Sequence, residues 1–372
     1  VHPDTTPGPT VGAYAAVVAS PVIASVRTEI LPDPFNPQLL IHVTGDDGRT
    51  GTGETWWGTY QPAAAPGTPV APIASMIDAV LGPVCLGQPL DSVADIEALW
   101  ERLHRATVQY GYEGIASTAI SGLDIAAWDL VARRRDVPVH SLLGPIVHDP
   151  IPVYASLTWL GDADLVCRDA ERAMAAGIRA VKLHEADVDL ILEVRRRLGP
   201  AVPLMVDASA RFDEPGAIAA AARLAAADLV WFEEPIFPQS DHAALARLRS
   251  GAAMPIAAGE NEFSVEGFER LIASGAIDIV QPEIAKFGGL TPARRVGELA
   301  HSVGIPMYPH NYSLGPSLLA NIHWAFTAPA ACWLEVPWLS EGGTFPCGLA
   351  MPELVDGCVT APTGPGLGFT RP

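Results

Sequence analysis

The stretch that decides the fold is Leu204-Met-Val-Asp-Ala-Ser209, whose pattern returns in Val230-Trp-Phe-Glu-Glu-Pro235 and Pro255-Ile-Ala-Ala-Gly-Glu260. Each stretch is a short apolar run that ends at an acid, and an Ala-, Arg- and Leu-rich segment follows it. Continuous apolar strands that alternate with helices are typical of parallel βαβ units buried on both faces. Eight such runs lie between residues 152 and 336, at Val153–Trp159, Ala180–Glu185, Leu204–Ser209, Val230–Pro235, Pro255–Glu260, Ile277–Glu283, Pro306–Asn311 and Cys332–Val336. This number predicts a closed (β/α) barrel rather than an open sheet.

Most of these runs end in a polar residue, and the polar residues are evenly spaced. Their successive intervals from Lys182 onward are 25, 26, 27, 23, 27 and 25 residues, or about one βα unit each. We therefore expect their side chains to form a ring at the mouth where the carboxyl ends of the strands meet, which is where such barrels build active sites. The ring consists of Lys182, His184, Asp207, Glu233, Glu260, Glu283, His310 and Glu335.

Three acids of this ring, Asp207, Glu233 and Glu260, follow adjacent strands. Three ionised carboxylates that converge in a low-dielectric mouth repel one another unless a cation lies between them. An all-oxygen ligand set with room for water and substrate favours Mg²⁺ over Zn²⁺. We therefore expect a magnesium site, although any single acid of the three could instead pair with a nearby Lys or Arg. Glu234 must point away from Glu233, either into a supporting role or toward the barrel wall.

Two further pairs of ring residues indicate acid–base chemistry. A carboxylate such as Glu283 that binds one ring nitrogen of His310 fixes the tautomer and raises the basicity of the other nitrogen, which predicts a general base or acid. Lys182 and His184 are two residues apart, so both point into the barrel. A buried lysine there can be a counter-ion, an anchor for a carboxylate or a proton carrier.

The residues ahead of the barrel have a different pattern. Val22–Thr28, Gln38–Thr44 and Thr50–Thr55 are predicted strands, and helical patterning runs from about Pro72 to Arg133. Residues 1–21 are rich in Pro, Thr and Ala and lack the apolar core of a secretory signal, so we expect a disordered arm.

The composition excludes several classes of partner. Asp and Glu number 42 against 23 Lys and Arg, a net charge of −19, which argues against a nucleic-acid or anionic-membrane surface. The apolar runs are shorter than the roughly 18 residues of a membrane span. Five cysteines without metal-type spacing favour free thiols and a cytoplasmic location.

Taken together, these motifs resemble the enolase superfamily, and within it the mandelate racemase/muconate lactonizing enzyme subgroup. The resemblance covers most of the chain from about Val22 onward. It is carried by Ala119-Ile-Ser-Gly-Leu-Asp-Ile-Ala-Ala-Trp-Asp129, Leu142-Leu-Gly144, Trp231-Phe-Glu-Glu-Pro235, Gly259-Glu-Asn261, Gln281-Pro-Glu283, Gly288-Gly289 and Pro309-His310.

The resemblance implies an α/β fold with two parts. Residues 22–150 would form an α+β capping domain, and residues 151–338 a modified TIM barrel of the (β/α)₇β type that carries the active site. Residues 339–372 would return to complete the cap. The family also usually forms symmetric assemblies, so we expect a homo-oligomer.

The resemblance also implies a common reaction, in which a proton next to a carboxylate is removed with the help of Mg²⁺. The three strand-end acids named above would hold the metal. Lys182 would face the substrate carboxylate, His310 and Glu283 would form an acid–base dyad, and Glu335 would donate a hydrogen bond to the enolate.

This chain departs from the family pattern at three positions. The second strand reads Lys182-Leu-His184 where the subgroup usually has Lys-x-Lys, so His184 is either the proton-transferring residue or a substrate ligand. The acid of the dyad is Glu283 where Asp is commoner. Ser209 stands where Asn is common, which affects only the surroundings of the metal.

The cap supplies specificity in this family, so Leu31–Pro37 and Trp56–Gln61 are the best candidates for a lid. The first is short, which favours an open pocket for a polar substrate. Trp56 and Trp57 could form a pocket wall or pack between cap and barrel.

Three functions fit this set of residues. A Mg²⁺-dependent acid-sugar dehydratase is the leading hypothesis, because two histidines in the mouth provide both a base and an acid for the departing hydroxyl. A racemase, epimerase or cycloisomerase with His184 and His310 on opposite faces fits the same residues. A carboxylate-binding protein that has lost turnover is the third possibility. In each case the ligand is a small carboxylate, either a sugar acid or a hydroxy acid.

Overall fold

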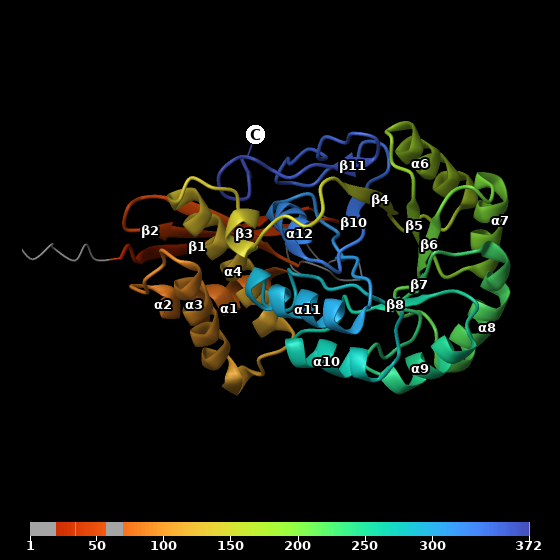
Figure 1. Ribbon diagram of the computed structural model, residues 1–372, viewed down its shortest axis with the longest axis horizontal. Coiled ribbons are helices and arrows are strands. Elements are labelled where there is room, and N and C mark those ends of the chain that lie inside the picture. The colour runs from red at the N-terminus through yellow and green to blue at the C-terminus, as the bar shows by residue number, and fades with distance from the viewer. Residues whose placement is uncertain (1–19, 34, 57–69, 372) are drawn as a thin grey trace, which may run out of the picture.

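The computed structural model describes residues 20–33, 35–56 and 70–371 (Figure 1). The predicted arm therefore lies outside the described residues except for its last two positions. Trp57 and the rest of the predicted lid segment after Trp56 lie outside them as well.

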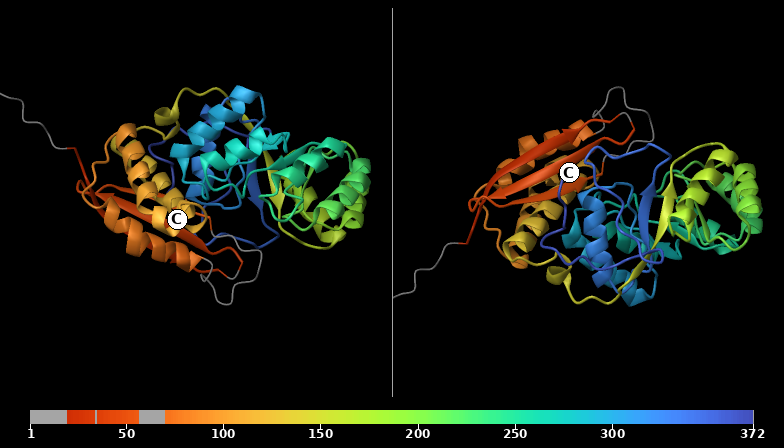
Figure 2. Two further views of the ribbon diagram at one scale, coloured as in Figure 1. Left: turned by 90° about the horizontal axis from the view of Figure 1, so that it is seen from below. Right: turned by 90° about the horizontal axis from the view of Figure 1, so that it is seen from above.

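The N-terminal part pairs an antiparallel sheet with a group of helices (Figure 2). The strands β1 (Ile23–Leu31), β2 (Gln38–Gly45) and β3 (Thr50–Thr55) follow one another in the order β1-β2-β3. The predicted helical stretch is broken into several pieces, because Pro and Gly residues interrupt it. These pieces are α1 (Ala71–Met76), the π-helical turn η2 (Ile77–Leu81), α2 (Gly82–Cys85), α3 (Val93–Ala106), the 3₁₀ turn η3 (Val108–Tyr110), α4 (Ile115–Arg134) and α5 (His140–Leu143).

Helix α4 packs against β3 at backbone distance. A Cβ atom added to Gly51 or Gly53 of β3 would lie 2.1 Å from a carbonyl oxygen of α4, that of Ala126 or of Gly122. Only glycine permits this approach. Helix α4 is also the one helix among the described residues that is long and apolar enough to cross a membrane, but 94% of its most apolar window is buried within the protein. It is the central helix of the N-terminal core.

The barrel follows as an alternation of strands and helices. The strands run in the spatial order β10-β4-β5-β6-β7-β8-β9, and every neighbouring pair is parallel. Their bounds are β4 (Ile151–Leu157), β5 (Val181–His184), β6 (Leu204–Asp207), β7 (Phe232–Glu233), β8 (Ile256–Ala258), β9 (Ile279–Val280) and β10 (Leu334–Trp338). The helices are α6 (Ala163–Ala175), α7 (Val188–Leu198), α8 (Glu214–Leu224) with the turn η4 (Ala225–Ala227), α9 (His242–Gly251), α10 (Val265–Ala273), α11 (Leu290–Val303) and α12 (Pro316–Thr327).

The seventh strand position is held by a single residue. Isolated parallel bridges join Val280 to Met307 and Met307 to Ala331, three residues before β10 begins. Because β10 pairs with β4, these bridges complete the ring of eight strand positions. Seven helices lie between them, so the predicted modified (β/α)₇β barrel with an N-terminal α+β part is confirmed.

The C-terminal residues run back over the N-terminal part (Figure 2). Strand β11 (Cys358–Val359) first pairs antiparallel with β4. The Leu367 backbone N–H then donates to Asp129 of α4, and Arg371 forms an ion pair with Glu29 of β1. The tail thereby links the barrel to the three-stranded sheet.

Candidate active site

A cavity of about 460 Å³ lies between the mouth of the barrel and the N-terminal helices. Four residues of the predicted ring line it, namely His184, Asp207, Glu260 and His310. The N-terminal part contributes its own wall, which includes Trp56, Ile73, Ile115 and Thr118. The carboxyl-end mouth is therefore a roofed pocket.

The three acids predicted to bind metal are all buried, with at most 3% of their surface exposed. Asp207 and Glu233 lie opposite one another on β6 and β7, and Glu260 follows β8 by two residues. Among the described residues, a cluster of potential ligand atoms within 4.8 Å of one another joins Glu233 and Glu260 to His310 and does not include Asp207.

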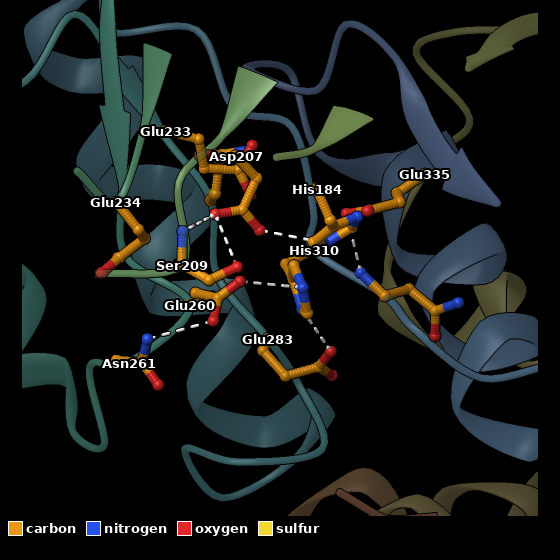
Figure 3. A network of polar contacts seen from close by, with 12 residues as sticks. His184, Asp207, Ser209, Glu233, Glu234, Glu260, Asn261, Glu283, His310 and Glu335 are labelled. Atoms are coloured by element: carbon orange, nitrogen blue, oxygen red, sulfur yellow. Dashed lines mark hydrogen bonds and ion pairs between the residues drawn. The ribbon is translucent and has the colours of Figure 1, made fainter. Parts of the chain in front are cut away.

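Each of these carboxylates contacts a basic side chain, and Figure 3 shows the contacts of Asp207 and Glu260 with histidines. Asp207 Oδ2 lies 3.0 Å from His184 Nε2, and Glu260 Oε2 lies 2.9 Å from His310 Nε2. Burial raises the pKa of Glu233 to about 7 despite its ion pair with Lys182, and the neighbouring carboxylates act in the same direction as burial. The site thus carries more buried negative charge than its cations offset.

The excess of buried negative charge makes the site suitable for a metal cation. The donor set is entirely carboxylate oxygen, the type that hard cations such as Mg²⁺ prefer, while His310 has both ring nitrogens engaged by acids. A divalent cation held by Asp207, Glu233 and Glu260 would offset the burial and the repulsion that together raise the pKa of Glu233. The residues present therefore fit Mg²⁺.

The structure brings His310 and Glu283 together. His310 Nδ1 lies 2.8 Å from Glu283 Oε2, and both residues are buried. The Nδ1–H must donate to this carboxylate, which leaves Nε2 as the nitrogen turned to Glu260 and the cavity. Although burial opposes it, the charge of Glu260 raises the pKa of His310 well above 6.5.

His184 is held by a similar pair of contacts. Its Nδ1 lies 2.6 Å from the carbonyl oxygen of Leu157, so this nitrogen must carry a proton. Its Nε2 points to Asp207, whose charge outweighs burial and raises the pKa of His184 above 6.5. Both histidines therefore present Nε2 to carboxylates that line the cavity.

Lys182 and Glu335 lie deeper in the barrel than the family pattern suggests. Lys182 is fully buried, and its Nζ is 2.7 Å from both Glu233 Oε1 and Glu335 Oε1. Lys182 is not among the residues that line the cavity, and it acts as the counter-ion of these two carboxylates; its role toward a substrate carboxylate stays a prediction. Glu335 accepts hydrogen bonds from the Tyr154 hydroxyl and the Asn311 N–H.

The electrostatics of Glu335 bear on its predicted role as a hydrogen-bond donor to an enolate. Burial would raise the pKa of Glu335, but the charges of Lys182 and His310 outweigh it and lower the pKa below 4.5. A lowered pKa favours the ionised form, which accepts hydrogen bonds, whereas the predicted donor role requires the protonated form and stays a prediction.

Glu234 supports the site from outside the barrel. Its Oε1 accepts a hydrogen bond from the N–H of Gly259, the residue before Glu260. Its own backbone has a φ of +41°, a conformation that non-glycine residues rarely adopt. Glu234 thus takes the supporting role that is one of its two predicted alternatives.

Several cavity residues have no counterpart in the predicted ring. Lys286 is buried with its Nζ 3.2 Å from Asn261 Oδ1 and 4.2 Å from the Trp56 ring centroid. Arg211 and Trp159, from the segments that follow β6 and β4, line the cavity as well. Lys286 follows Glu283 by three residues and Arg211 follows Asp207 by four, so a search of the loops just beyond the strand ends would find both.

Trp56 has both of its predicted roles. Its ring lines the cavity with its centroid 5.4 Å from that of His310, and its backbone N–H donates to the carbonyl oxygen of Ala285 in the barrel. The residue is therefore a wall of the pocket and a contact between the two parts of the chain.

Comparisons with known proteins agree with this architecture. The sequence model of the enolase C-terminal domain-like family matches residues 166–371. The model of the mandelate racemase/muconate lactonizing enzyme N-terminal domain matches residues 17–144.

Individual relatives cover nearly the whole chain. The 3,6-anhydro-alpha-L-galactonate cycloisomerase of Streptomyces coelicolor is 33% identical over 89% of this chain and 88% of its own length. The L-talarate/galactarate dehydratase of Salmonella typhimurium is 32% identical over 74% of this chain and 69% of its own. A Streptomyces coelicolor racemase solved with bound magnesium superposes with a TM-score of 0.79 at 30% identity, covering 94% of this chain and 97% of that one. The chain is therefore a member of the enolase superfamily, in its mandelate racemase/muconate lactonizing enzyme group.

Proposed function

We propose that this protein is a sugar-acid dehydratase that removes the proton α to a carboxylate and expels the hydroxyl group at the β carbon. The observation that carries the proposal is the pair of histidines at one cavity. His184 and His310 come from strand positions two and seven, and each has Nδ1 engaged, so each can exchange a proton only at Nε2.

The two imidazoles supply the two proton transfers that dehydration requires. One Nε2 takes the α-proton, and the electron pair of the broken C–H bond forms the enolate. The other Nε2–H gives its proton to the β-oxygen as the C–O bond breaks, so water leaves and the resulting enol becomes a 2-keto acid. Mg²⁺ held by Asp207, Glu233 and Glu260 would stabilise the negative charge that develops on the substrate carboxylate.

The relatives support this class of reaction. Besides the talarate/galactarate enzyme, an arabinonate dehydratase from Saccharolobus solfataricus is 29% identical over 79% of this chain. These names concern those proteins, and they support a small sugar acid as the substrate of this one.

A cycloisomerase is the second candidate. It rests on the two cycloisomerases from Streptomyces coelicolor and Agrobacterium fabrum, which at 33% and 30% identity align over 88% and 96% of their own lengths. The same histidines would serve if the β-oxygen belonged to a ring, because it would then leave the carbon without leaving the molecule.

Mass spectrometry separates the two candidates. We would incubate the protein and Mg²⁺ with a panel of sugar acids, anhydro-sugar acids and sugar lactones. A dehydratase yields a 2-keto acid lighter by one water, whereas a cycloisomerase yields an isomer of unchanged mass.

Two histidine variants make this test specific. His310→Asn should abolish product formation, and His301→Gln, which alters an exposed histidine near the end of α11, should leave it unchanged. If wild-type protein binds a sugar acid but exchanges no α-proton with deuterated solvent, the chain is a binding protein and the proposal is wrong.

A further inference from the structure

Arg211 is a charged cavity residue without an acid beside it. The other charged or titratable side chains that line the cavity in the described residues are engaged with one another, whereas no carboxylate lies within ion-pair distance of this guanidinium. Asp4 is the one acid in the sequence outside the described residues, and the segment 57–69 contains none. Arg211, whose side chain is exposed, is therefore a positive group of the cavity that forms no ion pair with the described residues.

The backbone that presents Arg211 is unusual. Ser209 and Ala210 both have left-handed conformations, with φ of +47° and +54°. The Ala210 N–H donates to the carbonyl oxygen of Glu234, and the Arg211 N–H donates to that of Ala208. This turn anchors the arginine to the strand that carries Asp207.

Trp159, which follows β4, orients the guanidinium. The Cζ atom of Arg211 lies 3.6 Å from the centroid of the Trp159 ring, so the two planar groups are in contact. A guanidinium in contact with an aromatic face keeps the N–H donors at its edge available. Those donors match the two oxygens of a carboxylate.

The cavity already provides for one substrate carboxylate. The acids proposed to hold Mg²⁺ follow strand positions three to five, and Lys286, whose Nζ lies 3.6 Å from Glu260 Oε1, follows position six. A monoacid bound by the metal and Lys286 would leave Arg211 without a counter-charge. A substrate with a second carboxylate at its other end would neutralise both.

We propose that Arg211, supported by Trp159, binds the second carboxylate of a sugar diacid, so that diacids are preferred over the corresponding monoacids. This inference rests on the proposed function, since it names the substrate class of the same site.

Matched substrates test the inference. Galactarate and galactonate share their stereocentres and differ only in whether the far carbon is a carboxylate or a hydroxymethyl group, and glucarate and gluconate form a second pair. For any pair that is turned over, we expect wild-type kcat/KM to be higher for the diacid. Arg211→Gln should lower kcat/KM for the diacid by about 10- to 100-fold, mainly through KM, as expected for the loss of a charge-assisted hydrogen bond. The monoacid should change by less than about 3-fold, within the range of surface substitutions.

Two further arginine variants serve as controls. Arg211→Lys should retain part of the preference, and Arg247→Gln, at an ion pair on α9, should retain all of it. If Arg211→Gln lowered kcat/KM equally for the diacid and the monoacid of a pair, or if the wild-type protein preferred monoacids, the inference would be overturned. Preference for 6-phosphogluconate over glucarate would show that Arg211 serves a phosphate and would overturn the assignment to a carboxylate.

A binding assay tests the preference for diacids even if the protein turns over none of these acids. If none of these acids is turned over, calorimetric titration of the Mg²⁺-loaded protein with galactarate and galactonate replaces the kinetics. Tighter binding of galactarate that is lost in Arg211→Gln supports the inference, whereas equal binding or no binding of the two acids overturns it.

Discussion

Replacing Lys182 with methionine tests the buried charge network under the cavity. The Lys182 ammonium lies 2.7 Å from one oxygen of Glu233 and 2.7 Å from one of Glu335, and all three side chains have no exposed surface. Methionine fills similar space without a charge. Removing one partner of a buried ion pair costs about 3–5 kcal/mol, because the remaining charge is left without compensation. The two contacts share one ammonium, so we expect a total loss within this range.

The loss should depend on pH in a defined direction. The pKa of Glu233 is about 7 with Lys182 present, and Lys182 lowers it, so the variant should have a higher value still. A carboxyl group whose pKa in the folded state exceeds its unfolded value destabilises the protein as pH rises between the two values. In Lys182→Met this range extends above pH 7, so the variant should lose more stability at pH 8 than at pH 6.

Urea denaturation in EDTA at both pH values measures the effect. Arg247→Met, which breaks an exposed ion pair with Glu214, is the control and should change stability little. If Lys182→Met were no less stable than this control at pH 8, the assignment of Lys182 as the counter-ion of two buried carboxylates would be wrong.

Three further predictions address other parts of the molecule. Gly53→Ala should destabilise the protein by about 3 kcal/mol, because its Cβ would lie 2.1 Å from the Gly122 carbonyl oxygen, whereas Gly251→Ala, with no atom within 4 Å, should be neutral or stabilising in the same urea assay. His323 is buried, and its pKa is lowered to about 3, chiefly by burial, so the stability that the neutral imidazole provides is complete above pH 6.5 and is lost as pH falls toward 3. His323→Gln should therefore reduce the slope of the unfolding free energy against pH between 6.5 and 3, and an unchanged slope would contradict this assignment. Glu233→Gln should weaken Mg²⁺ binding in calorimetry by at least about 10-fold, and undiminished affinity would refute the ligand assignment.

The order of the barrel was predictable from the sequence because parallel strands buried on both faces are apolar throughout. Each strand therefore stands out, and its polar end is easy to locate. The pairing of His310 with Glu283 follows from the same logic, since they end neighbouring strand positions. The weak seventh strand also has a physical reason, because Pro306 and Pro309 flank Met307 and cannot donate ladder hydrogen bonds.

The partners of individual side chains were not predictable in this way. Spacing places Lys182 and His184 on the same face of a strand. It does not show that Lys182 is a buried counter-ion, whereas His184, two residues further along β5, lines the cavity. Lys286 and Arg211 lie on loops beyond the strands, where periodicity carries no information. Their positions depend on backbone turns that only the folded chain reveals.

The N-terminal part does more than cover the barrel. Glu54 of β3 is completely buried and accepts hydrogen bonds from the hydroxyl groups of Ser313 and Ser317 at 2.6 and 2.8 Å, and from the backbone N–H of Ser317 at 3.0 Å. Both serines follow His310 by only a few residues, in the segment that leads into α12. A buried carboxylate is costly unless such donors satisfy it, so the sheet and this segment hold each other in place. Because Trp56 directly follows the end of β3, this strand positions both a wall of the cavity and the loop that carries the histidine, and the site depends on both parts of the chain.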